Sequence, residues 1–232
     1  MRHIAGATVA LSLISVLVVG PAAPAGAAGP LRPGMLIQLG NTQCTANFVY
    51  DGTGAQAGNV YFGTAAHCAE AVGQQVSDGN GRVWGSVAFI GNAGNVATDF
   101  AFIRVLSGFK SAVRAGVAGR PSAPKGVAAP GPAGFGSLVL VSGYGLIFRP
   151  TSLTREQRRG VLLGANARVY QAEVPIFFGD SGGPLVQLGS NRALGIVSVI
   201  CFGVCGLARG PTVAGLLHVA AARGFHVRLR TT

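Results

Sequence analysis

Short apolar runs separated by glycine and asparagine turns dominate the chain from residue 35 onward. The runs are enriched in β-branched and aromatic residues, and turn signals recur about every ten residues, which is typical of strands in a barrel or sandwich. One set of predicted strands comprises 35–40, 45–51, 59–66, 82–91 and 99–106, and a second comprises 137–145, 160–174, 183–189 and 193–200. The pattern therefore predicts an all-β fold in two halves.

Residues 107–136 separate the two sets and are rich in Gly, Ala, Pro and basic residues, which predicts a surface linker. One helix is predicted at about 212–223, between Thr212 and Gly224. Its apolar residues recur at helical spacing, namely at Val213, Leu216, Leu217 and Ala220. We expect this face to dock on the second half, and His218 on the same helix to be a structural or surface residue.

The N-terminus has the pattern of an export signal over residues 1–27. A basic start precedes an apolar run at 4–20, and small residues suited to a signal peptidase follow, so we expect cleavage after Ala27. The run is short for a membrane span, although an uncleaved anchor is the alternative interpretation. Residues 28–34 would then form a short lead and 35–232 the main domain. We expect a secreted, extracellular protein that has no membrane attachment after cleavage.

Charge is strongly one-sided, with 18 Lys and Arg against 7 Asp and Glu and a formal net charge of +11. An arginine-rich segment at 149–159 predicts attraction to an anionic surface, and a merely solvated basic loop is the alternative. The sequence shows no interleaving of basic and aromatic residues, no helix-turn-helix pattern and no zinc-finger spacing. Nucleic acid is therefore not expected as a partner.

The four cysteines are an even number, as expected for a disulfide-bonded protein in an oxidising compartment. Three pairings are open on paper, and they involve Cys44, Cys68, Cys201 and Cys205. Cys44 and Cys68 flank one predicted hairpin and can pair, which would hold the residue next to Cys68 in position. A CxxC pair is missing from the sequence, so neither a zinc site nor a redox site is expected.

Candidate chemistry centres on "FFGDSGGPLVQ", residues 177–187, which places Ser181 among glycines. A serine hydroxyl becomes a nucleophile only beside a base, and that base needs an acid to orient it. The other three histidines lie in the signal or the C-terminal segment, which leaves His67 as the base, with an ordinary loop histidine as the alternative. Asp99 opens an apolar run where a carboxylate needs a partner, and His67 would supply one. An aspartate capping a turn is the alternative for Asp99.

The glycines around Ser181 suit an unusual backbone conformation. Gly179, Gly182 and Gly183 tolerate dihedral angles that other residues resist. Such a loop can point the N–H groups of Gly179 and Ser181 at one spot, as in an oxyanion hole, where each donor contributes about 3 kcal/mol. Asp180, next to the serine, is expected to be buried and to hold the loop in shape.

The motifs "TAAHC", "TDFAFIRV" and "GDSGGPL" occur in the order His, Asp, Ser. In these motifs the chain resembles the trypsin/chymotrypsin family of serine proteases, especially its secreted bacterial members, over residues 35–232. The resemblance implies a chymotrypsin-like fold of two six-stranded antiparallel β-barrels, at about 35–115 and 130–210, with a C-terminal helix and an active site between them. It implies polypeptide substrates, a monomer, and no metal or organic cofactor.

The same resemblance assigns roles to individual residues. His67 would be the general base, Asp99 the orienting acid and Ser181 the nucleophile, with Gly179 and Ser181 donating to the oxyanion. Ser198 matches the position whose hydroxyl supports the triad aspartate and whose carbonyl holds the substrate backbone.

Departures from the family pattern bear on specificity. Pro175 stands six residues before the serine, where trypsin-like members carry Asp, so cleavage after Lys or Arg is not expected. Phe178 and Pro175 would make the approach to the pocket apolar, and Ile200 would narrow it where the family often has Gly. These residues predict a preference for small or medium apolar side chains before the cleaved bond. The alternative is that Phe177 and Phe178 simply pack beneath the loop.

Other departures concern bridges and activation. Phe177 replaces a cysteine that many members bridge to the pocket wall, so we expect Cys201 and Cys205 to pair with each other, with a reduced pair as the alternative. The sequence has no Ile-Val-Gly-Gly start, and Asp180 therefore needs another partner, such as an internal arginine. A catalytically inactive relative acting as a secreted binding protein is the competing function. An α/β-type esterase is disfavoured, because Gly-x-Ser-x-Gly and alternating helices are missing.

Overall fold

A computed structural model describes residues 29–145, except for 119, 121, 130, 132 and 133, together with residues 156–200 and 207–232. Several sequence predictions lie outside these residues: the signal at 1–27, most of the 149–159 segment, and the pairing of Cys201 with Cys205. The side chain of Ile200 also lies outside the described part.

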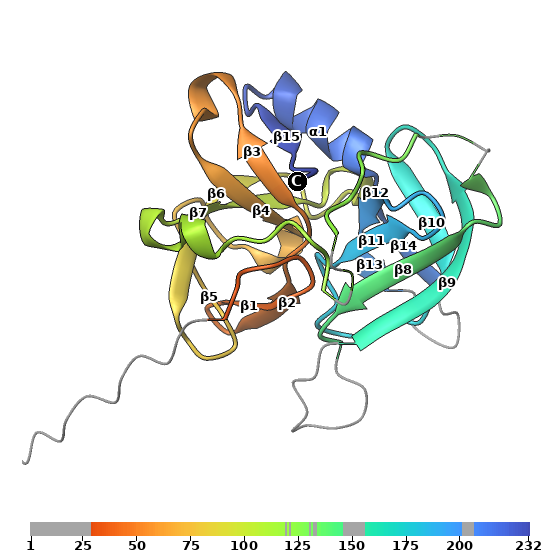
Figure 1. Ribbon diagram of the computed structural model, residues 1–232, viewed down its shortest axis with the longest axis horizontal. Helices are drawn as coiled ribbons and strands as arrows, with labels where there is room; N and C mark the ends of the chain where they lie inside the picture. The colour runs from red at the N-terminus through yellow and green to blue at the C-terminus, as the bar shows by residue number, and fades with distance from the viewer. Residues whose placement is uncertain are drawn as a thin grey trace, which may run out of the picture.

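Two curled antiparallel sheets stand side by side (Figure 1). The first has the order β15-β3-β4-β7-β6-β5-β1-β2, and the second has the order β12-β11-β8-β9-β10-β14-β13. The strands of the first are β1 (Leu36–Leu39), β2 (Thr42–Thr45), β3 (Val49–Gly52), β4 (Val60–Thr64), β5 (Gln75–Ser77), β6 (Val83–Ile90), β7 (Ala101–Val105) and β15 (Val227–Leu229). The strands of the second are β8 (Leu138–Gly143), β9 (Glu156–Ala165), β10 (Val169–Glu173), β11 (Pro184–Gln187), β12 (Arg192–Ile196), β13 (Val199–Ile200) and β14 (Leu207–Pro211).

The predicted all-β fold of two halves with a C-terminal helix is confirmed. The sheets contain eight and seven described strands instead of six each. One reason is that the predicted strand 160–174 is a hairpin, in which β9 and β10 flank a turn closed by Asn166 N–H donating to the Val169 carbonyl. Another is β15, a short strand that the sequence pattern did not reveal.

Three apolar clusters fill the interior. One lies within the first sheet around Trp84. Its ring contacts the ring of Phe62 edge-on, with the two centroids 5.4 Å apart. Another lies within the second sheet around Leu162 and Leu185. The third joins residues of both sheets and the helix, including Phe102, Ile196 and Leu216. Because the residues of this shared cluster are buried and apolar, it holds the two halves against each other, and a site between them can be rigid.

The helix α1 (Val213–Ala222) falls within the predicted range. Thr212 caps it, since its hydroxyl accepts a hydrogen bond from Gly215 N–H at 3.0 Å. Leu216 is buried against the shared cluster, whereas His218 is exposed, as expected. The chain then returns to the first sheet, where β15 pairs with β3 (Figure 1).

The linker is more than a surface connection, which corrects the prediction for 107–136. It begins with a 3₁₀ helix at Ser107–Ala112 and then buries Val113, Val117 and Ala118. The lead is also part of the fold, because Leu31 is 1% exposed and forms a parallel bridge with Val113.

Candidate active site

A buried carboxylate and an exposed imidazole meet at the junction of the two halves. His67 lies in a 3₁₀ turn (Ala66–Cys68) that follows β4, and Asp99 ends a second 3₁₀ turn (Val96–Thr98), two residues before β7 begins. His67 Nδ1 lies 2.8 Å from Asp99 Oδ2, and His67 N–H donates to Asp99 Oδ1 at 2.9 Å. The hydroxyl of Ser198, from the second half, also donates to Asp99 Oδ2.

These contacts favour one tautomer of the neutral ring. Asp99 is 2% exposed, so its charge depends on donors within the protein. With Nδ1–H directed at that carboxylate, Nε2 is the nitrogen that can accept a proton. The structure thus brings His67, Asp99 and Ser198 together.

A disulfide holds the turn that carries His67. Cys44 at the end of β2 is bonded to Cys68, with their Cα atoms 6.3 Å apart. This is one of the three pairings that four cysteines allow. Within the described residues, the only cluster of three metal-ligand side chains is Cys44, His67 and Cys68. Both sulfurs of that cluster are consumed by the disulfide, so it does not form a metal site.

Ser181 lies in a sharp loop between β10 and β11 that packs against the first half. Its carbonyl accepts a hydrogen bond from Thr45 N–H at 2.8 Å and lies 4.0 Å from Cys68 Sγ, next to His67. Gly179 and Gly182 have φ angles of +101° and +83°. A Cβ on Gly182 would lie 2.2 Å from Thr64 Oγ1, so only glycine fits this close approach.

Two polar residues that sequence reasoning missed hold this loop in place. The Thr45 hydroxyl donates to the Gly179 carbonyl at 2.7 Å, and the Asn47 amide donates to the Gly182 carbonyl at 3.0 Å. Both residues are buried in the first half. The available signal was the polar interruption "TAN" after Cys44, since a buried polar side chain needs a specific partner.

Asp180 finds its partner on β9. Its side chain is fully buried and pairs with Arg158 at 2.5 Å, and Arg158 itself is only 9% exposed. Gly145 N–H and Phe177 N–H donate to the two Asp180 oxygens at 2.9 and 2.7 Å. Arg158 belongs to the segment 149–159 that was expected to face an anionic surface. The structure corrects this for Arg158, which points inward because Asp180 needs a cation.

The two backbone donors predicted for an oxyanion hole are available. Among the described residues, neither Gly179 N–H nor Ser181 N–H donates a hydrogen bond to the protein, whereas Asp180 N–H between them donates to Phe177 O at 3.0 Å. Both N–H groups are therefore open to an acceptor other than the described chain.

The predicted pocket residues divide into exposed and buried ones. Pro175 is exposed and Phe178 is 64% exposed, so both are accessible to a substrate. Phe177 instead packs beneath the loop, with its ring 5.2 Å from the Arg158 guanidinium carbon. Packing beneath the loop thus describes Phe177 but not Phe178, whose ring is exposed. Ser198 is 6% exposed, and Ile200 lies in β13.

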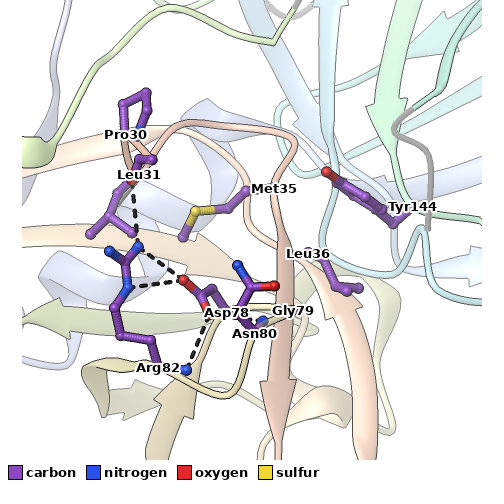
Figure 2. A pocket seen from close by; sticks show the side chains of 10 residues that line it. Pro30, Leu31, Met35, Leu36, Asp78, Gly79, Asn80, Arg82 and Tyr144 are labelled. Carbon is purple, nitrogen blue, oxygen red and sulfur yellow. Dashed lines mark hydrogen bonds and ion pairs between the residues drawn. The ribbon is translucent and has the colours of Figure 1, made fainter. Parts of the chain in front are cut away.

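A separate hollow of 240 Å³ lies beside Tyr144 (Figure 2). Asp78 and Arg82 form an ion pair at one side, and Leu36 and Tyr144 lie at the other. Tyr144 connects this hollow to the Ser181 loop, because its backbone N–H donates to Thr45 Oγ1 at 3.2 Å and that hydroxyl donates to the Gly179 carbonyl. None of the three candidate catalytic residues lines the hollow, so it is not the reaction centre.

Comparison with known proteins settles the family. The model of the trypsin family matches residues 33–221. The chain belongs to the trypsin family. A member of this family is a serine-type endopeptidase, and its substrates are polypeptides. A search of curated protein sequences found no match.

Solved structures agree with this trypsin-family assignment. The chain is 26% identical to a Nocardiopsis protease (NAPase), with a TM-score of 0.62 over 86% of this chain and 98% of that one. Thermobifida fusca protease A matches with 23% identity, a TM-score of 0.62 and the same coverage. A chymotrypsin from Cellulomonas bogoriensis matches with 22% identity and a TM-score of 0.57 over 87% and 100% of the two chains. The last two show the fold.

No helix among the described residues is both long enough and apolar enough to cross a membrane.

Proposed function

We propose that this trypsin-family chain is a secreted endopeptidase in which Ser181, His67 and Asp99 form the catalytic triad. The observation that carries the proposal is the His67–Asp99 pair, with Nδ1 and Oδ2 2.8 Å apart, beside the loop of Ser181. Asp99 orients the ring and stabilises its protonated form, and the Ser198 hydroxyl positions Asp99.

The reaction proceeds through an acyl-enzyme. His67 Nε2 takes the Ser181 hydroxyl proton while Oγ attacks the peptide carbonyl, giving a tetrahedral intermediate. Its oxyanion is bound by Gly179 N–H and Ser181 N–H, which have no protein acceptor among the described residues. The intermediate collapses as His67 passes the proton to the departing amine. Water, deprotonated by His67, then hydrolyses the Ser181 ester and releases the acid.

The specificity proposal rests on the residues before the loop. Pro175 offers no charge to a basic side chain, and the exposed ring of Phe178 adds apolar surface. Ile200 stands where the family often has Gly, and a larger residue at that position would narrow the pocket. These residues support a preference for small or medium apolar side chains before the cleaved bond.

Export is the remaining part of the proposed function. Residues 1–27 have the charge, apolar core and small residues of a cleavable signal. The Cys44–Cys68 disulfide supports an oxidising destination, because such bonds persist outside the reducing cytosol.

A peptide-library digestion tests the proposal. The processed protein should cleave after residues such as Ala, Val or Leu, and cleavage should follow Lys or Arg far less often. The Ser181→Ala variant, folded to the same thermal stability, should cleave nothing. Cleavage that survives Ser181→Ala would exclude Ser181 as the nucleophile, and cleavage mainly after basic residues would contradict the pocket assignment.

A further inference from the structure

Three arginines line one hollow of 460 Å³ away from the candidate active site. Arg32 comes from the lead, and Arg114 and Arg120 both come from the linker after its 3₁₀ helix. Ala115, Gly116, Ala123 and Thr232 complete the lining. The hollow shares no residue with the His67–Asp99 pair, with the Ser181 loop or with the hollow beside Tyr144.

The backbone brings Arg32 and Arg114 to the same face. Leu31 and Val113 form a parallel bridge, in which Leu31 N–H donates to Ala112 O at 3.0 Å and Arg114 N–H donates to Leu31 O at 2.8 Å. Leu31 and Val113 are buried, at 1% and 7% exposure. Since successive side chains of an extended pair alternate between faces, the next residues, Arg32 and Arg114, both turn outward.

Arg114 and Arg120 are held by further bonds. The Arg114 guanidinium donates from Nη1 to the carbonyls of Ser111 and Val113, at 2.8 and 2.9 Å. Ala118 N–H donates to Pro33 O at 3.0 Å, which ties the linker to the lead next to Arg32. Arg120 follows two residues later and is half-buried. The site is therefore built from tethered backbone and one restrained guanidinium.

Among the described residues, no aspartate or glutamate side chain forms an ion pair with this cluster. Each of the four aspartates is paired elsewhere: Asp51 with Arg230, Asp78 with Arg82, Asp99 with His67 and Asp180 with Arg158. No ion pair within 4.0 Å joins a described carboxylate to Arg32, Arg114 or Arg120. Three like charges around one hollow repel each other, and an anion between them would relieve that repulsion.

We propose that the hollow is a binding site for a tetrahedral oxyanion, either phosphate or sulfate, free or as the end group of a larger molecule. Guanidinium groups match such anions because their planar N–H donors bind two oxygens at once. The proposal is independent of the catalytic triad and adds a second ligand to the protease.

Calorimetric titration with inorganic phosphate, at constant ionic strength set with chloride, tests the site on the processed Ser181→Ala protein. We expect saturable binding with one phosphate per chain. Arg32→Gln and Arg114→Gln should each weaken binding by roughly tenfold or more, as expected for loss of a charge-assisted hydrogen bond. Arg32 makes no side-chain hydrogen bond with the described chain, so Arg32→Gln tests binding without disturbing the fold. Arg223→Gln, an exposed arginine outside the hollow, is the matched control and should bind as before.

Two outcomes would overturn the proposal. The first is no saturable binding. The second is equal weakening of binding by all variants, Arg223→Gln included, which indicates a diffuse basic surface. A sulfated oligosaccharide distinguishes the two sources of the anion. If it displaces phosphate with higher affinity, and Arg32→Gln weakens it too, the natural ligand is an end group and not a free ion.

Discussion

Arg158 and Asp180 form a buried ion pair directly behind Ser181, with Arg158 Nη2 2.5 Å from Asp180 Oδ1. Both side chains are withdrawn from water, and the carboxylate also accepts two backbone N–H groups. The cation that balances Asp180 therefore comes from within the chain, from strand β9. This arrangement fixes the loop that presents Gly179 N–H and Ser181 N–H.

Loss of the Arg158 charge should lower both the stability of the protein and the rate of peptide hydrolysis. Arg158→Met leaves Asp180 buried without its counter-charge, which we expect to cost about 3–5 kcal/mol of unfolding free energy. Denaturant titration measures this change, and peptide hydrolysis should fall with it. Arg159→Met, on an exposed neighbouring position, is the control and should change neither quantity appreciably.

The double variant Arg158→Met/Asp180→Asn separates charge from packing. It removes the buried charge and should recover part of the lost stability. If the double variant is no more stable than Arg158→Met alone, the pair does not act through the charge of Asp180.

Gly182 is expected to tolerate no side chain. Gly182→Ala would place a Cβ 2.2 Å from Thr64 Oγ1 and 2.5 Å from Thr45 O, at a φ of +83°. The loop must then move away from the first half, and kcat should fall by more than about a hundredfold, as for loss of an oxyanion donor. Gly189→Ala is the matched control, because a Cβ there meets nothing within 4 Å. Near-normal turnover by Gly182→Ala would contradict the close packing of the Ser181 loop against the first half.

Thr45 should act as a positioning residue. Thr45→Val keeps the shape but removes the hydroxyl that donates to Gly179 O and accepts from Tyr144 N–H. We expect kcat to fall about tenfold with KM nearly unchanged, as for a lost hydrogen bond that holds an oxyanion donor in place. Steady-state kinetics separate the two parameters, and Thr42→Val on the same strand is the control. A rise in KM alone would instead assign Thr45 to substrate binding.

Two buried tyrosines predict an alkaline limit to stability. Burial raises the pKa of Tyr50 and of Tyr170 well above the ordinary value of 10.0. Above about pH 10 the unfolded chain loses these protons while the folded one keeps them. The contribution of the two tyrosines to the free energy of unfolding is thus complete below about pH 10 and declines as the pH rises further.

Denaturant unfolding at a series of alkaline pH values tests whether the free energy of unfolding declines in this way. Tyr170→Phe removes one such group, along with its hydrogen bond to Ile196 O, and should flatten the decline by at most about 1.4 kcal/mol per pH unit. An unchanged slope would show that Tyr170 does not remain protonated in the folded protein.

Local signals in the sequence were enough to predict much of the fold and the candidate site. His67 and Cys68 end an apolar strand, Asp99 begins another, and glycines flank Ser181. Each of these patterns depends on a few adjacent residues. The φ angles of Gly179 and Gly182 show why glycine is needed there.

Features that depend on distant contacts could not be predicted in this way. Thr45 and Asn47 bond to a loop 134 and 135 residues away, and no short pattern encodes that contact. Arg158 looked like part of a basic surface, because its inward direction follows from the register of β9 opposite Val141 of β8. β15 is three residues long, too short for a period-two pattern to stand out.

Labelling of Ser181 tests the central claim most directly. The processed protein is treated with an organophosphorus serine-hydrolase probe, digested, and mapped by mass spectrometry beside His67→Ala and Ser181→Ala. The predicted result is a single adduct on Ser181 that is lost in both variants, since the hydroxyl reacts only when His67 takes its proton. A folded, disulfide-bonded protein that gives no adduct, or an adduct that persists in His67→Ala at the same rate, would contradict the proposed triad.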